Sequence, residues 1–195
     1  MAKQKMYKKI IFSDSIIASE IKDNQLHEII NRILKEKEIA NQGVIKSNRK
    51  GFQTDTIDNF YLNKTFTLKA VECLKENYTL DKKTRLQLTS LWINKNYKES
   101  YNAPHVHPRS DFSGVYYVDA SEKEGKLIFL RNDKTASFTN NCFLFDCSDF
   151  HGYYQIQPKN NLFILFPSHL DHMVAPHNDD KPRISVSFNF QLNNE

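Results

Sequence analysis

The chain has 195 residues, of which 27 are lysine or arginine and 23 are aspartate or glutamate, so its formal net charge at pH 7 is +4. The length suits a single domain with a sizeable core. The lysines are scattered, which excludes the concentrated basic surface that nucleic-acid binding requires. No apolar run in the sequence is long enough to cross a membrane. We therefore expect neither a nucleic-acid partner nor a membrane partner.

The cysteines and the amino terminus indicate the compartment. The basic amino-terminal residues are not followed by the apolar stretch of a signal peptide. The three cysteines, Cys73, Cys142 and Cys147, form no C-x-x-C pair, and an odd, unpatterned count is typical of a reducing environment. Both observations favour a cytoplasmic protein. The oligomeric state stays open, with a homodimer as one option.

Residues 1–84 predict a flank of helices and a strand that packs outside the main sheet. Residues 6–12 indicate a short strand, after which Asp14 or Ser15 is expected to cap a helix. His27 lies off the apolar face of that helical region, so we expect its side chain in solvent. The amphipathic helical stripe itself consists of Leu26, Ile29, Ile30, Ile33 and Leu34.

The rest of this flank is less regular. Residues 41–64 are polar and predict no regular structure. Thr65 is expected to cap a second helix that runs to about Tyr78. The apolar face of this second helix is predicted to consist of Leu68, Val71 and Leu74. We interpret the whole flank as scaffold rather than as part of a functional site.

From Arg85 onward the chain predicts strands and turns almost throughout. One face of the first strand is expected to carry Leu86, Leu88, Ser90, Trp92 and Asn94. Further short strands are indicated at residues 113–118, 126–130, 141–145, 152–157, 162–166 and 183–190. Closely spaced antiparallel strands of this kind fit a jelly roll. The predicted fold class is therefore mainly β with flanking α-helices, in one domain (residues 1–195) whose β core spans residues 85–195.

Two histidines, His105 and His107, stand one residue apart just before the strand at residues 113–118. In an extended segment alternate side chains point the same way, so both imidazoles are expected to face one side. Pro104 and Pro108 favour that extension, because the residue before a proline is pushed toward the β region. A metal requires three or four ligands, so this pair predicts only part of a metal site.

A third ligand is available in the turn after the apolar strand at residues 162–166, which carries His169, Asp171 and His172. The last predicted strand alternates cleanly between two faces. Its apolar face consists of Ile184, Val186, Phe188 and Phe190, and its polar face of Arg183, Ser185, Ser187 and Asn189. An arginine binds a carboxylate through paired hydrogen bonds, and a neighbouring hydroxyl can add another. The polar face therefore predicts a ligand that bears a carboxylate.

Taken together, these motifs resemble those of the iron(II)- and 2-oxoglutarate-dependent oxygenases. The order of His105-x-His107, then His172, then Arg183-x-Ser185 is similar to the order of that family's metal ligands and cosubstrate-binding arginine. The motifs of this chain resemble more closely those of a bacterial and phage subgroup of the family. The matching motifs are Trp92-x-Asn94, His105 to Pro108, Ser113 to Val118, Leu165 to Pro167 and Arg183 to Asn189. The resemblance covers about residues 85–192 and, more weakly, residues 47–55.

The resemblance implies a double-stranded β-helix, which is a cupin-like jelly roll, and the activity of a hydroxylase that uses Fe(II) and 2-oxoglutarate. It implies that the metal ligands are His105, His107 and His172. The implied contacts to 2-oxoglutarate are Arg183, Ser185, Tyr117 and Asn102. With O₂ as the oxidant, the cosubstrate would leave as succinate and CO₂ while a small-molecule or peptidyl substrate is hydroxylated, and no side chain need act as a nucleophile.

One position departs from the family pattern, because His107 stands where the family has a carboxylate. A three-histidine face still suits Fe(II), but it carries one negative charge less, and Asp111 is the alternative ligand. The departure also favours a three-histidine, cupin-type dioxygenase that does not use 2-oxoglutarate, whereas Arg183 and Ser185 argue against it. A metal-binding β-barrel module without catalytic activity is a further alternative.

Several polar side chains also have plainer explanations. His169 is expected to line the entrance of the site, His177 to lie in solvent, and His151 to be structural or exposed. Arg183 would otherwise be a surface residue at the start of a strand. Its place on the face of Ser185 and Asn189 argues for a cavity instead.

The register of the strand at residues 113–118 decides which tyrosine faces the site. Tyr117 shares a face with Val115 and Ser113. Tyr116 takes its place if the strand shifts by one residue, because such a slip turns every side chain to the other face.

Overall fold

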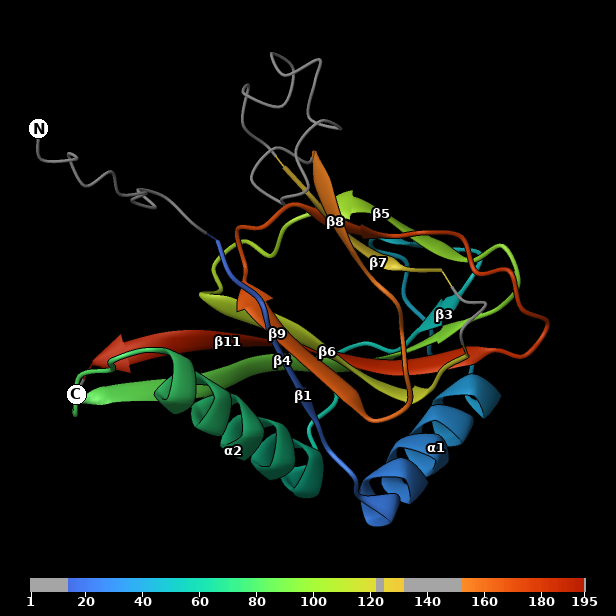
Figure 1. Cartoon of the computed structure of the whole chain (residues 1–195). Coiled ribbons are helices and arrows are strands. Elements are labelled where there is room, and N and C mark those ends of the chain that lie inside the picture. Colours follow the sequence, from blue (N-terminus) through green and yellow to red (C-terminus); the bar gives the residue numbers. More distant parts are fainter. Residues whose placement is uncertain (1–13, 122–124, 132–151, 195) are drawn as a thin grey trace, which may run out of the picture.

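The computed structural model describes residues 14–121, 125–131 and 152–194. Within these residues the strands form two antiparallel sheets that face each other (Figure 1). The six-stranded sheet has the order β1 (Ile17–Glu20), β9 (Leu162–Pro167), β6 (Phe112–Asp119), β11 (Arg183–Asn194), β4 (Thr84–Asn96) and β3 (Phe52–Gln53). The five-stranded sheet has the order β2 (Asn48–Arg49), β5 (Tyr101–His105), β10 (His172–Val174), β7 (Leu127–Leu130) and β8 (Tyr153–Ile156). The predicted mainly β fold with flanking helices is confirmed.

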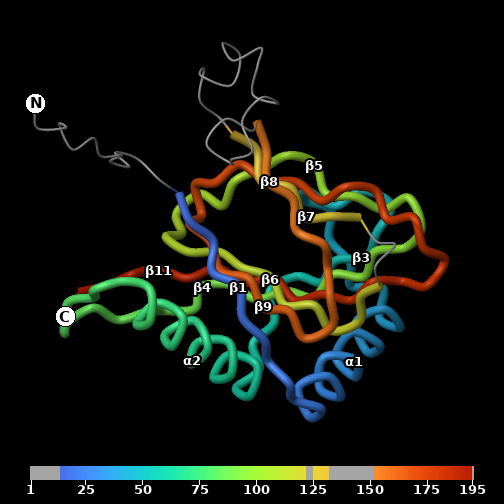
Figure 2. Tube along the Cα trace, viewed as in Figure 1, coloured from blue at the N-terminus to red at the C-terminus, as the bar shows by residue number. Residues whose placement is uncertain are grey.

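Two helices, α1 (Asn24–Ile39) and α2 (Phe60–Asn77), cover the outer face of the larger sheet, on the side away from the smaller one (Figure 2). β11 runs through the middle of that sheet, paired with β4 on one side and with β6 on the other. Its apolar and polar residues alternate between two faces, as the sequence predicts, and the polar face is buried at Arg183 and Ser185 and half-buried at Ser187 and Asn189. Val186, Phe188 and Phe190 pack in the helix-side core, while Arg183, Ser185 and Ser187 line a cavity between the sheets.

α1 is where its apolar stripe predicts it, and it buries Leu26, Ile30 and Leu34. The predicted cap at Asp14 or Ser15 is wrong, because the residues that follow pair with β9 as strand β1. The cap is Asp23, whose carboxylate accepts a hydrogen bond from the backbone N–H of Leu26 at 3.1 Å.

His27 is not in solvent as predicted. It is half-buried, and its Nε2 lies 2.8 Å from the hydroxyl of Tyr116. That hydroxyl also donates to the backbone carbonyl of Ile21 at 2.9 Å. The contact joins α1 to the larger sheet. The apolar stripe of the helix does not reveal it, because the partner Tyr116 lies far along the chain.

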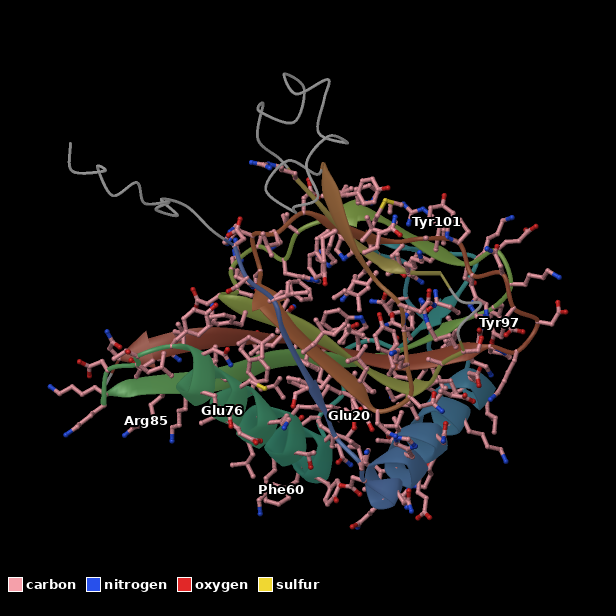
Figure 3. The ribbon with its side chains drawn as sticks, in the orientation of Figure 1. Glu20, Phe60, Glu76, Arg85, Tyr97 and Tyr101 are labelled. Atoms are coloured by element: carbon pink, nitrogen blue, oxygen red, sulfur yellow. The ribbon has the colours of Figure 1, made fainter. Side chains whose placement is uncertain are left out.

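α2 begins earlier than predicted, at Phe60, and Asn59 rather than Thr65 caps it by accepting from the N–H of Leu62 at 3.1 Å. The side chain of Leu68 is 59% exposed, so the predicted apolar face is displaced around the helix. The buried face consists of Leu62, Phe66, Ala70, Cys73 and Leu74. Phe60 points away from the sheet (Figure 3) and is 81% exposed.

Aromatic packing holds α2 on the sheet. The ring of Phe188 on β11 stacks on Phe66 at 5.1 Å and on Phe163 of β9 at 5.2 Å, measured between ring centroids. Tyr116 of β6 contacts Phe66 at 5.6 Å. Aromatic pairs of this kind add stability beyond the apolar area that they bury. The helix-side core is therefore built around the strands that also carry the cavity on their other face.

The first long strand, β4, does not keep one face throughout, which corrects the prediction. Asn189 pairs with Ser90 and Phe190 pairs with Leu88, so Thr89 is an extra residue that forms a bulge. Before the bulge Leu86 and Leu88 face the helix-side core. After the bulge Leu91 and Ile93 face it instead. Trp92 and Asn94 consequently point into the space between the sheets.

Three further predictions have different outcomes. Residues 41–64 are not wholly irregular, since they contain β2, β3 and the start of α2. The strands predicted at residues 6–12 and 141–145 lie outside the described residues.

In the part of the chain that is described, no helix is long and apolar enough to cross a membrane.

Candidate metal centre and adjoining cavity

Three histidines converge on the smaller sheet. His105 ends β5, and His172 begins the neighbouring strand β10, where the two residues are cross-strand partners. His107 follows β5, and its backbone N–H donates to the carbonyl of Ser168 at 3.0 Å. The nitrogen ligand atoms of the three rings all lie within 4.8 Å of one another. The structure therefore brings together the histidines that the sequence singles out.

Backbone contacts fix the tautomers of two of these rings. Nδ1 of His105 lies 2.7 Å from the carbonyl oxygen of Ala103, and Nδ1 of His172 lies 2.9 Å from that of Leu170. A carbonyl oxygen only accepts, so each Nδ1 carries the proton and each Nε2 keeps a free lone pair. Holding the second nitrogen in this way is how proteins orient metal-binding histidines.

The cluster favours uncharged imidazoles. Burial, with the neighbouring His172 and His105, lowers the pKa of His107 to about 3. Burial, with His105 beside it, lowers the pKa of His172 to about 4. Burial also lowers the pKa of His105, although its contact with Ala103 opposes the shift. All three rings are neutral at pH 7, which is the form that binds a metal. Three imidazoles suit Fe(II) and related transition metals.

Asp111, the alternative ligand, is not part of the three-histidine cluster. Its carboxylate accepts a hydrogen bond from the backbone N–H of Leu192 at 2.7 Å, and its backbone N–H donates to Phe190 at 2.9 Å. These contacts fasten Asp111 to the far part of β11. Among the described residues, the group whose ligand atoms meet in one place contains the three histidines and not Asp111.

A cavity adjoins the histidines, between the two sheets, with about 520 Å³ of empty space including its open side. The larger sheet supplies three rows of its lining. Cross-strand pairs set these rows, with Trp92 beside Ser187, Asn94 beside Ser185, and Asn96 beside Arg183. The ring centroids of Trp92 and His107 are 5.8 Å apart, so the row of Trp92 and Ser187 lies beside the histidines. The row of Asn96 and Arg183 lies farthest from them.

Arg183 is buried, with only 2% of its surface exposed. One of its terminal nitrogens donates to the carbonyl of Gly125 at 2.8 Å, and its guanidinium lies 5.8 Å from the ring centroid of Tyr117. A side chain at Gly125 would collide with the backbone of Ala175, so this close approach requires glycine. The site thus contains a buried cation at the opposite end of the cavity from Trp92 and His107.

The register of β6 agrees with the prediction. Tyr117 and Val115 line the cavity, whereas Tyr116 packs in the helix-side core. Ser113 shares their side of the strand, and its hydroxyl bonds to Ser168 at 2.7 Å and to Asn189 at 2.8 Å. Tyr117 is therefore the tyrosine that a bound ligand would meet.

The polar lining also includes acceptors that have no hydrogen-bond partner among the described residues. The side-chain oxygens of Asn94 and Asn96 are both buried in this way, and the two residues are 7% and 2% exposed. A buried polar atom without a partner costs about 1–3 kcal/mol. Cavity-facing amides in this state indicate that a polar ligand belongs in the cavity.

The remaining histidines have other places. His177 is fully buried and its Nε2 donates to the carbonyl of Lys181 at 2.8 Å, so the prediction of a solvent position is wrong. His169 has 71% of its side chain exposed, pairs with Asp14 at 3.0 Å, and does not line the cavity. His151 lies outside the described residues.

Two polar residues of the cavity lining, Ser47 and Asn96, are not predicted from the sequence. Ser47 lines the cavity, which corrects the interpretation of the whole amino-terminal flank as scaffold. Its hydroxyl accepts from the amide of Asn102 at 3.1 Å, and Asn102 also lines the cavity. Asn96 was missed as well, although the alternation of Trp92 and Asn94 points to it. The weak resemblance at residues 47–55 was the one signal for Ser47.

The comparison with protein families decides the identity. Residues 90–189, more than half of the chain, match the family model described as "Putative 2OG-Fe(II) oxygenase". The chain belongs to the 2OG-Fe(II) oxygenase family. This oxygenase is accordingly an enzyme whose cofactors are Fe(II) and 2-oxoglutarate, as the resemblance implied. The three-histidine cluster fits the iron. No curated protein sequence matches the oxygenase.

Solved structures share its fold. A prolyl-4-hydroxylase from Pseudomonas putida is 13% identical, with a TM-score of 0.62 over 92% of this chain and 93% of that one. The α-ketoglutarate-dependent epimerase SnoN from nogalamycin biosynthesis is 12% identical, with a TM-score of 0.65 over 91% and 78%. The oxygenase spans 45% of a 2OG-Fe(II) oxygenase from Burkholderia pseudomallei, at 15% identity and a TM-score of 0.44 over 56% of this chain. The first two show the double-stranded β-helix.

Proposed function

We propose that this oxygenase hydroxylates a small-molecule or peptidyl substrate, using Fe(II) held by His105, His107 and His172 and 2-oxoglutarate held at its far carboxylate by Arg183. The observation that carries the proposal is one cavity with a converging set of imidazole nitrogens at one end and a buried guanidinium at the other. A chelating oxo acid with a second carboxylate matches both ends.

Each side chain has a definite task in this proposal. Nε2 of His105, Nε2 of His172 and one ring nitrogen of His107 hold the metal, and the carbonyls of Ala103 and Leu170 keep the first two rings oriented. Arg183 presents a rigid donor fork to the carboxylate, and the neighbouring Ser185 hydroxyl adds a donor from the same face of β11. Tyr117 covers the guanidinium from the adjacent strand.

The cavity wall also supports the chemistry. When bound, the iron would activate O₂, which is the oxidant, and 2-oxoglutarate would supply two of the electrons and leave as succinate and CO₂. Val115, Leu127 and Phe166 give the cavity an apolar part that limits water around the reacting groups. O₂ takes up the electrons in this scheme and no side chain is oxidised or reduced, so the protein's work is to hold and orient the reacting groups and to exclude water.

His107 in the place of a carboxylate motivates the alternatives of a dioxygenase that does not use 2-oxoglutarate and of a non-catalytic metal-binding module. The buried Arg183 argues against both, since neither requires a guanidinium at the end of the cavity. Anaerobic titration with Fe(II) and then with 2-oxoglutarate distinguishes the proposed function from these two alternatives. We expect a weak visible charge-transfer band only after both have been added. Iron binding without that band would contradict the proposal.

Arg183 is the proposed partner of the far carboxylate of 2-oxoglutarate. Arg183→Gln should weaken 2-oxoglutarate binding about 10- to 100-fold, because a hydrogen bond to a charged group contributes about 1.5–3 kcal/mol. Fe(II) binding should persist, since Arg183 is not among the converging ligands. The affinities are measured by anaerobic titration of folded protein, checked by circular dichroism.

Arg32→Gln is the matched control, because Arg32 is exposed on α1, outside the cavity lining. It should leave both affinities unchanged. Unaltered 2-oxoglutarate affinity in Arg183→Gln would instead favour the three-histidine dioxygenase that needs no cosubstrate.

A further inference from the structure

Ser47 lies directly before β2, and its hydroxyl reaches the metal centre from the amino-terminal flank. The Ser47 Oγ is 3.4 Å from Nε2 of His105 and accepts from the amide nitrogen of Asn102 at 3.1 Å. Because Nδ1 of His105 donates to Ala103, Nε2 is an acceptor. The serine hydroxyl is therefore the donor, and it is aimed at the lone pair that a metal would take.

The position of Ser47 does not depend on that contact. Its backbone carbonyl accepts from the N–H of Ala103 at 3.0 Å, which joins it to β5. The next residue, Asn48, is buried and braces the loop, since its side chain accepts from the N–H of Lys46 at 2.7 Å and donates to Val44 at 3.1 Å. Ser47 is thus held beside the histidines by a rigid support, as functional groups require.

Metal binding changes what the hydroxyl can do. Once Nε2 of His105 is occupied by a metal, the Ser47 O–H loses its acceptor, while Asn102 still donates to the oxygen. The proton must then find another acceptor on the same side of the three-histidine face. We propose that the Ser47 hydroxyl donates a hydrogen bond to the metal-bound, oxo-acid end of 2-oxoglutarate, with Asn102 as the positioning residue.

This inference rests on the proposed function and deepens it. The cosubstrate would be recognised at both ends, by Ser47 from the smaller sheet and by Arg183 from the larger one. The three-histidine face supplies no negative charge, so the oxo acid's own carboxylate is the anion in the site. A hydroxyl donor to an anionic oxygen makes a charge-assisted hydrogen bond, the stronger class.

The test uses the full chain under anaerobic conditions. Fe(II) affinity is measured first, then 2-oxoglutarate affinity through the charge-transfer band, for wild type, Ser47→Ala and Ser47→Thr. Ser47→Ala should bind Fe(II) at least as tightly as wild type, because the competing hydrogen bond to His105 is gone. Its affinity for 2-oxoglutarate should fall about 10- to 100-fold, as expected for one charged hydrogen bond, and the band should shift. Ser47→Thr keeps the hydroxyl and should restore both.

Ser19→Ala is the matched control, a half-buried serine on β1 outside the cavity lining, and should behave as wild type. Unchanged 2-oxoglutarate affinity and band in Ser47→Ala would overturn the inference. Loss of Fe(II) itself in that variant would also overturn it, because Ser47 would then be a ligand rather than a donor. A wild-type protein that binds Fe(II) but no 2-oxoglutarate would overturn the proposed function, and the inference with it.

Discussion

At the scale of single residues, each candidate ligand is fixed by what lies behind it. The Nδ1 contacts of His105 and His172 with backbone carbonyls leave their Nε2 atoms ready for a metal. His107 is fixed differently, by its backbone bond to Ser168 and by the ring of Trp92. Preorganised neutral rings need little rearrangement to bind a metal.

Removal of any one ring should abolish stoichiometric Fe(II) binding, because two imidazoles do not complete the face. We expect this for His105→Ala, His107→Ala and His172→Ala. The protein should stay folded, since the cluster lies between the sheets rather than in the helix-side core. Metal content after anaerobic loading and desalting is the measurement, with circular dichroism as the check on folding.

Asp111→Ala tests the alternative ligand and should retain iron, because its carboxylate is bonded to the N–H of Leu192. If Asp111→Ala lost the metal while His107→Ala kept it, two histidines and a carboxylate would be the ligands. That result would refute the three-histidine assignment.

Residue patterns in the sequence predict part of this site. The alternation of His105 with His107, and of Arg183 with Ser185, follows from strand geometry alone. The choice of His172 over His169 came from the family resemblance, since both lie in one turn. Ser47 was missed because its contact with His105 joins segments distant in the chain, and no local pattern reports such a contact.

At the scale of elements, amphipathic periodicity is readable where an element packs against one surface. The stripe of α1 is therefore predicted correctly. α2 was misplaced because Thr65 resembles a cap, whereas Asn59 makes the capping contact. The bulge at Thr89 could not be predicted, because it arises from pairing with Asn189 and Phe190 on β11. A bulge reverses the two faces of everything beyond it.

α1 is also joined to β4 by an ion pair that makes stability depend on pH. The ammonium of Lys95 lies 2.8 Å from the Glu38 carboxylate, and the hydroxyl of Tyr97 donates to it at 2.8 Å. Burial raises the pKa of Glu38, but these hydrogen bonds prevail, and the pKa is lowered from its ordinary 4.5. The stabilisation is present above the unfolded pKa and is lost as pH falls through the folded pKa.

Glu38→Gln should therefore lower the free energy of unfolding at pH 7 by up to about 1 kcal/mol, as for a partly exposed pair. The difference from wild type should shrink as the pH is taken below 4.5. Urea unfolding at a series of pH values measures it. Glu28→Gln, an exposed site on the same helix, serves as control. An equal loss at pH 7 and at the acid end would refute the linkage.

At the scale of the whole molecule, the larger sheet packs against the helices with one face and lines the cavity with the other. β11 presents Phe188 to the helices and Arg183 to the cavity, so the packed layer beneath gives the cavity floor its rigidity. The smaller sheet has no helix over it among the described residues, and its strands are short. The candidate metal ligands all come from this smaller sheet and the loop beside it. A metal would therefore join the less supported half of the fold.

This placement predicts that metal loading stabilises the protein. A ligand that binds only the folded state at 100 times its Kd adds about 2.7 kcal/mol, which for a chain of this size raises Tm by about 5–10 °C. Thermal unfolding is followed with Mn(II) or Ni(II), which avoids oxidation, and a chelator should reverse the shift. 2-Oxoglutarate should raise Tm further only when metal is present, because the chelating end needs the metal. His172→Ala should show neither shift, and a metal-induced rise in that variant would place the binding site elsewhere.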